Sequence, residues 1–248
     1  MNVLNIVIAL LATAFICFVL WRYVFSLNAL LHRDGFKYVS VLLVLFSIVG
    51  GLLLPVPRMA ILHETVRNLY YHVPMWFGML GVLLASFVHG IAYLRGFRLE
   101  NDIASAQAAN IGTWLGALGL LTGMVWAQYT WGEWWSNDPK QTASAIGMLI
   151  YLAYFVLRGS IDDDDKRAKI SAVYNIFAFC TLIPLLFVIP RIQDSLHPGS
   201  GGNPGFNAYD LDNRMRMVFY PAVVGWILLG GWLVSLKVRV ELLFSKLS

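Results

Sequence analysis

Residues 73–95 read VPMWFGMLGVLLASFVHGIAYLR, an apolar run whose only charged side chain is Arg95 at its end. A helix needs about 20 apolar residues to cross the roughly 30 Å hydrocarbon core of a bilayer. Six further runs meet this criterion, near residues 3–26, 38–55, 104–128, 142–158, 169–190 and 217–237. The pattern predicts an all-α protein, a polytopic membrane helical bundle with seven candidate spans.

The overall composition supports a membrane protein. The chain of 248 residues is 58% hydrophobic and 13% charged, whereas soluble domains carry about 25% charged residues. These values exclude a soluble globular domain, a disordered chain and a nucleic-acid-binding protein. The net charge of +4 requires no acidic partner, because cytoplasmic loops of membrane proteins are enriched in Lys and Arg. Cys17 and Cys180 lie inside apolar runs, so we expect no disulfide and no thiol chemistry.

The distribution of basic residues predicts the orientation in the membrane. Twelve of the 18 Lys and Arg residues fall in one set of connections and six in the other. Because the excess marks the cytoplasmic side, the N-terminus is predicted outside and the C-terminus inside. The connections 56–72, 129–141 and 191–216 then lie on the outer side. They contain the Trp-rich and His-containing segments, so we expect the functional site there.

The spans divide the chain into three predicted parts. Residues 1–37 form the extra transmembrane helix and a cytoplasmic turn, residues 38–240 form the six-span membrane domain, and residues 241–248 form a cytoplasmic tail. The fourth span has an additional pattern of glycines at spacings of four, three and four. These residues lie on one helix face and predict close contact with a neighbouring helix; they are Gly112, Gly116, Gly119 and Gly123.

Two histidines are candidate ligands of a heme iron. His72 and His197 lie on different outer connections, each at the mouth of the bundle. Two neutral imidazoles from separate segments are what a six-coordinate heme iron requires. A lone interfacial His is more often a hydrogen-bonding residue, so neither position is decisive alone. His89 lies 17 residues after His72, about 25 Å deeper in the membrane, and cannot share a ligand plane with it.

Three tryptophans in the second outer connection predict an aromatic platform. Trp131, Trp134 and Trp135 lie within five residues, and in a helix Trp131 would share a face with the other two. Such a platform suits a flat porphyrin, although an ordinary aromatic belt at the membrane interface is the alternative.

The outer connections have two further features. Asp138 is followed by Pro139 and Gln141, a pattern typical of a capping box that opens the fifth span. Cations on the outer side could pair with heme propionates, and the sequence does not choose among them; they are Arg58, Arg67, Lys140, Arg191, Arg214 and Arg216.

The segment WGEWWSNDPKQT at residues 131–142, with Tyr71-His72-Val73-Pro74 before it and Leu196-His197 after it, resembles the Trp-rich signature of the heme-handling proteins of cytochrome c maturation. The compact size and the single His on each side fit the CcmC family best. The resemblance covers residues 38–240. One departure is Asn137, where the family commonly has a further Trp. The other is the number of spans, because the resemblance implies a six-span core and leaves 3–26 as one extra N-terminal transmembrane helix.

The resemblance implies a heme-handling domain in the bacterial inner membrane that holds heme b on the periplasmic side. It implies His72 and His197 as axial ligands of the iron. The other heme-binding residues that it implies are Trp131, Trp134, Trp135 and Asp138, with no catalytic residue. The implied partners are the periplasmic heme chaperone CcmE, the ATPase CcmA, CcmB and the one-span CcmD.

Other interpretations make different demands on the sequence. The extra span 3–26 could be a fused CcmD-like helix, but we favour a family-specific extension. A cytochrome c synthetase of the related CcsA type is usually longer and carries more His within its spans. A membrane b-type cytochrome requires facing His pairs inside the bilayer, and a solute transporter requires ionisable residues in mid-span. We therefore expect a heme-delivery protein and not an enzyme.

Overall fold

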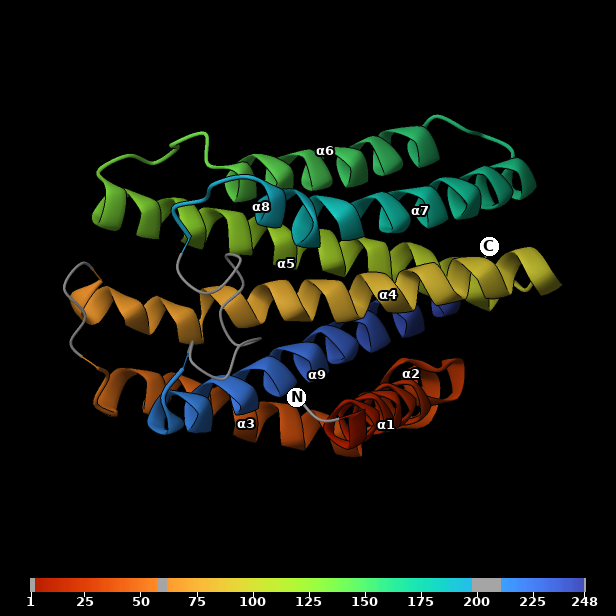
Figure 1. The fold of residues 1–248 in the computed structure, drawn as a ribbon. Helices are drawn as coiled ribbons and strands as arrows, with labels where there is room; N and C mark the ends of the chain where they lie inside the picture. The colour runs from red at the N-terminus through yellow and green to blue at the C-terminus, as the bar shows by residue number, and fades with distance from the viewer. Residues whose placement is uncertain (1–2, 58–61, 198–210, 248) are drawn as a thin grey trace.

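The computed structural model of the chain describes residues 3–57, 62–197 and 211–247 (Figure 1). The described residues contain helices and no strand. The elements are α1 (Val3–Leu20), the π-helix η1 (Trp21–Phe25), α2 (Leu27–His32), α3 (Gly35–Leu53), the 3₁₀-helix η2 (His63–Tyr70), α4 (His72–Gly96), α5 (Leu99–Trp131), α6 (Pro139–Gly159), α7 (Asp164–Phe187), α8 (Ile189–Ile192) and α9 (Asn213–Phe244).

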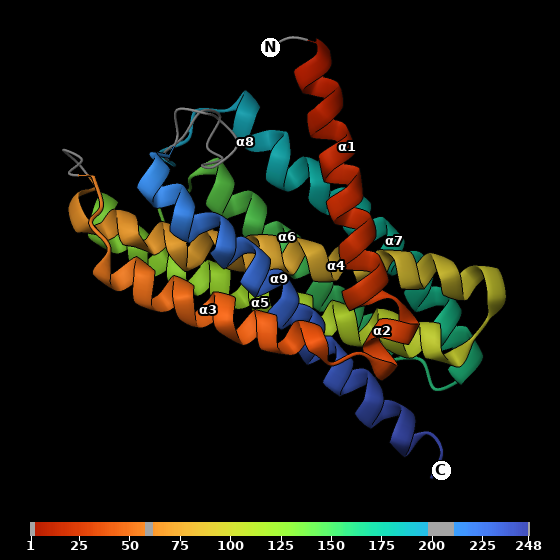
Figure 2. The same cartoon turned by 90° about the horizontal axis from the view of Figure 1, so that it is seen from below.

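Six helical segments in the described residues are long and apolar enough to cross a membrane. They correspond to α3, η2 with α4, α5, α6, α7 with α8, and α9, which confirms the predicted six-span core. The additional N-terminal run forms α1 and η1, a shorter apolar helix. Figure 2 shows α1 leaving the bundle at a steep angle instead of running along it. That α1 crosses the membrane stays a prediction.

The spanning helices alternate in direction, so the helix ends that the three long connections join lie together at one end of the bundle (Figure 1). The long connections join α3 to α4, α5 to α6, and α7 to α9. The short turns 97–98 and 160–163 lie at the opposite end. We call the end with the long connections the outer end. That it faces the periplasm stays a prediction.

Helix α4 lies at the centre of the bundle and packs against α5, α7 and α9. The glycine face of α5 allows the close approach that the sequence predicts. A Cβ atom added at Gly112 would lie 2.4 Å from a methyl carbon of Leu83 on α4. One added at Gly116 would lie 2.4 Å from the sulfur of Met148 on α6. The prediction of tight helix packing is confirmed.

The half of the core away from the outer end is held by His89, which is 2% exposed. Its Nδ1 lies 3.1 Å from Asn101 Oδ1 and its Nε2 lies 2.8 Å from the carbonyl oxygen of Phe25. The ring of Trp21 lies 5.2 Å from the His89 ring. His89 therefore anchors η1 to α4 and α5, and both of its nitrogens have partners.

The helix that follows the Trp-rich segment begins at the N-cap that the sequence predicts, but the printed bonds are not those of a capping box, in which Gln141 would bind the Asp138 N–H. Asp138 is the N-cap of α6, its side chain accepts a hydrogen bond from the Lys140 N–H, and Pro139 occupies the first turn. The Gln141 side chain reaches back to Ser136, whose N–H and hydroxyl lie 3.1 Å from Gln141 Oε1. The cap joins the loop before α6 to the helix, which fixes where the loop leaves the bundle.

Candidate functional site

A cleft opens at the outer end of the bundle and encloses about 1140 Å³ of empty space, its mouth included. Its walls come from η2, α4, α5, α6, α7 and the segment after α8. His72 and His197 both line this cleft. The structure thus brings together the two histidines that the sequence singled out.

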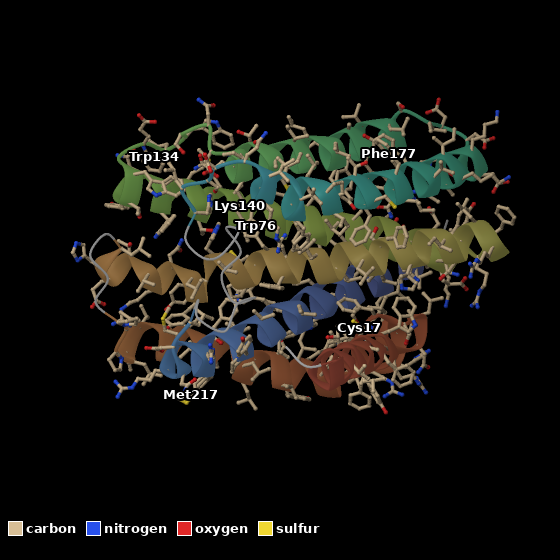
Figure 3. All side chains as sticks on the ribbon, viewed as in Figure 1. Cys17, Trp76, Trp134, Lys140, Phe177 and Met217 are labelled. Carbon is tan, nitrogen blue, oxygen red and sulfur yellow. The ribbon has the colours of Figure 1, made fainter. Side chains whose placement is uncertain are left out.

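His72 is the first residue of α4 and lies against α5. Its Nδ1 is 3.0 Å from the hydroxyl oxygen of Thr122. One turn further along α4, Trp76 lies with its ring edge-on to His72, at a centroid distance of 6.2 Å. Trp76 also lines the cleft, and Figure 3 shows it near Lys140 at the outer end. The start of α4 therefore supplies one imidazole and one indole to the same wall.

His197 follows α8 and is held by the carboxylate of Asp138. Its Nδ1 lies 2.9 Å from Asp138 Oδ1. The other carboxylate oxygen accepts hydrogen bonds from the Ser195 hydroxyl at 2.9 Å and the Leu196 N–H at 2.7 Å. The Asp138 side chain is fully buried and does not line the cleft. Asp138 thus caps α6 and also positions the His197 loop.

The electrostatics of this pair favour a neutral imidazole. Burial lowers the pKa of His197, and the charge of Lys140 lowers it further, although the hydrogen bond with Asp138 acts in the opposite direction. Burial alone would raise the pKa of Asp138, but hydrogen bonds from His197, Leu196 and Ser195 hold that pKa well below its usual value. A neutral His197 that donates from Nδ1 to the carboxylate has a free lone pair on Nε2, the form that binds metals.

Only one of the three tryptophans of the predicted aromatic platform lies beside a candidate ligand. Trp131 ends α5, and its ring lies 5.1 Å from the His197 ring. Residues 132–138 are not helical, so the condition for one shared helix face is not met. Trp134 is 53% exposed at the outer edge of the molecule (Figure 3), and Trp135 donates to Asn137 Oδ1 at 3.1 Å. None of the three predicted indoles lines the cleft itself.

Two other tryptophans, Trp76 and Trp126, line the cleft instead. The Trp126 ring lies 5.2 Å from that of Trp131 and 6.4 Å from that of His197. Sequence reasoning missed both because they lie inside apolar runs, where Trp commonly faces lipid. The available signal was spacing, since Trp76 lies four residues after His72 and so shares its helix face.

The structure gives a physical reason for Asn137. Its backbone is left-handed, with φ of 55°. Asn adopts this conformation more readily than bulky residues do. Asn137, the residue before the N-cap, therefore changes the direction of the chain just before α6 begins. Its side chain also accepts the hydrogen bond of the Trp135 indole.

Among the outer cations, Lys140 is the one that lines the cleft in the described residues. Arg67 instead binds Glu64 and the carbonyl oxygens of Gly51 and Leu54 at the end of α3. The remaining candidates are Arg191, which bonds the Phe187 carbonyl oxygen, Arg214, which lines a separate pocket, Arg216, which bonds Asn213, and Arg58, which lies outside the described residues.

Comparisons with known proteins indicate the family. The family described as heme exporter protein C, CcmC, matches residues 9–248 of the chain. The chain is 28% identical to heme exporter protein C of Rhodobacter capsulatus over 211 residues, 82% of this chain and 83% of that protein. It is 26% identical to heme exporter protein C of Paracoccus denitrificans over 184 residues, 72% of this chain and 73% of that protein.

A second family shares a shorter segment. The chain is 42% identical to the cytochrome c biogenesis protein CcsA of Prochlorococcus marinus over 78 residues, which is 32% of this chain and 25% of that protein. By contrast, the match to the heme exporter family runs through almost the whole length, including most of α1. The chain therefore belongs to the heme exporter protein C family, CcmC.

Proposed function

We propose that this chain holds heme b at the outer end of its bundle, with His72 and His197 as axial ligands, and presents it to a periplasmic chaperone of the CcmE type. Membership of the family indicates a heme-handling role in cytochrome c maturation. One observation carries the more specific proposal. Both imidazoles line one cleft, and each has its Nδ1 within hydrogen-bond distance of a side-chain oxygen, an arrangement that favours Nε2 as the atom that binds iron.

The other residues of the cleft fit the chemistry of a porphyrin. Trp76 and Trp126 supply flat apolar walls, and Phe187 extends them. Lys140 supplies a positive charge near the mouth, which suits a propionate. When bound, heme supplies an iron centre with two axial positions. In this proposal the histidines bind it, Asp138 orients His197, and the indoles exclude water from the porphyrin faces.

A delivery role also requires access from outside. The cleft is open at the outer end, and the exposed Trp134 lies in the adjoining loop, where a chaperone could contact it. In this proposal the chain lies in the bacterial inner membrane with its outer end in the periplasm, works with CcmA, CcmB and CcmD, and is a delivery subunit without catalytic residues. The exposed loop that carries Trp134 supports chaperone contact, and the family membership supports the Ccm partners.

The CcsA-type synthetase is the second candidate, and the 42% identity over 78 residues favours it. That segment covers a quarter of the CcsA protein, so it supports a shared heme-handling segment better than a shared whole activity. A b-type cytochrome fits less well. His89, inside the spans, has both nitrogens engaged by Asn101 and Phe25, and no second His faces it in the described residues.

The test is the visible spectrum and heme-to-protein ratio of the purified protein. The wild type should show a six-coordinate, low-spin heme. His72→Ala and His197→Ala should each weaken binding, and exogenous imidazole should refill the vacated position. The double variant should insert but carry little heme, whereas His63→Ala and His89→Ala serve as controls and should keep most of it. A double variant with the wild-type spectrum would refute the ligand assignment.

Presentation to the chaperone needs its own measurement. Replacing Trp131, Trp134 and Trp135 together with Ala should lower heme retention and abolish heme-dependent copurification with CcmE. Normal maturation of c-type cytochromes by the triple variant would show that these indoles are only an interfacial belt.

A further inference from the structure

We propose that Thr122 and Gly123 of α5 form a seat that sets the tautomer and orientation of His72. Both would then be positioning residues for the iron ligand. The inference rests on the proposed function, because it concerns how the chain prepares His72 to bind iron. Two independent features support it, namely the hydrogen bonds of the Thr122 hydroxyl and the space that Gly123 leaves open.

The Thr122 hydroxyl is arranged as an acceptor toward His72. Its oxygen lies 2.8 Å from the Leu118 carbonyl oxygen and 3.0 Å from the Gly119 carbonyl oxygen. A hydroxyl carries one proton and two lone pairs, so donation to the backbone leaves a lone pair for His72 Nδ1 at 3.0 Å. This arrangement places the imidazole proton on Nδ1. The lone pair then lies on Nε2, the other ring nitrogen.

Gly123 provides the space in which the His72 ring lies. A Cβ atom added there would lie 2.7 Å from His72 Cε1, 3.4 Å from Nδ1 and 3.5 Å from Nε2. The first distance is shorter than real Cβ contacts, so a side chain would push the ring away from α5. Gly119 does the same for Trp76, since its added Cβ would lie 2.8 Å from Trp76 Cε2.

These residues share one face of α5, because positions three and four apart on a helix are neighbours. The inner half of the same face has a different role. Gly112 contacts Leu83, and Gly116 contacts Met79 and Met148, so the inner half serves apolar helix packing. The outer half contacts the rings that line the cleft. Gly112 is therefore a matched control for Gly123, on the same helix face but away from the site.

In this proposal, each of the two histidines is oriented for iron binding by a side-chain oxygen at its Nδ1. His197 has the Asp138 carboxylate at its Nδ1, and His72 has the Thr122 hydroxyl. Partners of this kind fix the tautomer and orientation of a ligating imidazole, and their loss typically costs about 10–100-fold in metal affinity. The same loss is expected here when Thr122 is replaced by a residue of similar shape without a hydroxyl.

The experiment compares Thr122→Val, Thr122→Ser, Gly123→Ala and Gly112→Ala with the wild type by heme titration, Soret spectrum and electron paramagnetic resonance. We expect Thr122→Val to bind heme about 10–100-fold more weakly and to lose part of the six-coordinate signal, which imidazole restores. Thr122→Ser should behave like the wild type. Gly123→Ala should change the resonance of the bound heme, and Gly112→Ala should lower the thermal stability without changing that resonance.

The outcomes separate this inference from the proposed function. If Thr122→Val keeps the wild-type spectrum and affinity while His72→Ala changes both, the seat is refuted and the ligand assignment stands. If His72→Ala itself leaves the spectrum unchanged, the proposed function fails first. Should Gly123→Ala not insert into the membrane, Thr122→Val and Thr122→Ser decide the question alone.

Discussion

Asp138→Asn is the substitution that most directly tests how the site is built. The carboxylate of Asp138 accepts four hydrogen bonds, two on each oxygen. Oδ1 faces the Lys140 N–H at 2.9 Å and His197 Nδ1 at 2.9 Å. Oδ2 faces the Ser195 hydroxyl at 2.9 Å and the Leu196 N–H at 2.7 Å. An amide of the same shape keeps only one acceptor oxygen, so it must turn an NH₂ group toward one of these two pairs.

The expected magnitude follows from which pair loses its acceptor. If the NH₂ group faces Leu196, the Leu196 N–H loses its acceptor and the His197 loop is held less firmly. If it faces His197, Nδ1 loses its acceptor, and the imidazole favours the tautomer with its proton on Nε2, which cannot bind iron through that atom. Loss of such a partner lowers metal affinity about 10–100-fold, which corresponds to about 1.4–2.8 kcal/mol in heme binding. Asn is about as good an N-cap as Asp, so the cap of α6 is kept whenever the amide oxygen faces the Lys140 N–H.

The assay is heme titration of the purified variant, with thermal unfolding measured in parallel. Asp163→Asn is the matched control, because Asp163 also caps a helix with one carboxylate oxygen, 2.8 Å from the Lys166 N–H, but lies at the opposite end of the bundle. It should lose stability at most and keep the heme affinity. Equal affinities for wild type and Asp138→Asn would refute the positioning role, as would an equal loss in Asp163→Asn.

Three further predictions concern charge, pH and the inner anchor. Lys140→Gln should weaken binding of heme but not of heme dimethyl ester, which lacks free propionates, and Arg191→Gln should change neither; equal loss for both ligands would contradict a propionate contact. Because burial beside Lys140 lowers the pKa of His197 below its usual 6.5, while Asp138 opposes this, His197 is neutral at pH 7. The six-coordinate spectrum should therefore persist at pH 7 and be lost only on acidification below 6.5, and loss above that pH would contradict this protonation state. His89→Ala leaves the Phe25 carbonyl and Asn101 without partners, which costs about 1–3 kcal/mol each; thermal unfolding should show this, with an unchanged heme spectrum.

The six-span core could be predicted from the sequence because each span is identified by its own residues. An apolar run long enough to cross the bilayer can be recognised without knowing what packs against it. The ends of the helices are less readable, since α5 and α9 continue beyond the apolar runs 104–128 and 217–237 to Leu99–Trp131 and Asn213–Phe244. Polar residues outside the hydrocarbon can extend a helix without adding hydropathy. The angle between α1 and the bundle depends on contacts between helices, which the sequence of α1 alone does not predict.

The candidate site could be predicted where residue type implies chemistry. Two outer histidines stood out, and the structure places both at one cleft. The partners that prepare them did not stand out, because Thr122 lies in an apolar run and Ser195 in a connection, and neither belongs to a motif. Asp138 was predicted as a helix cap, which it is. Its contact with His197 joins residues 59 positions apart, and only the folded chain reveals such a pairing.

The order in which the two ligands release iron is a final prediction. The glycines and prolines at 198–205 favour His197 as the mobile ligand, but that stretch lies outside the described residues. The described contacts favour the reverse order. A charged carboxylate makes an imidazole a stronger donor than a neutral hydroxyl does, so carbon monoxide should replace His72 first. Asp138→Asn should then shift the Fe–CO stretching frequency, which responds to the remaining ligand, and Thr122→Val should leave it unchanged. A shift in Thr122→Val alone would show that His197 leaves first.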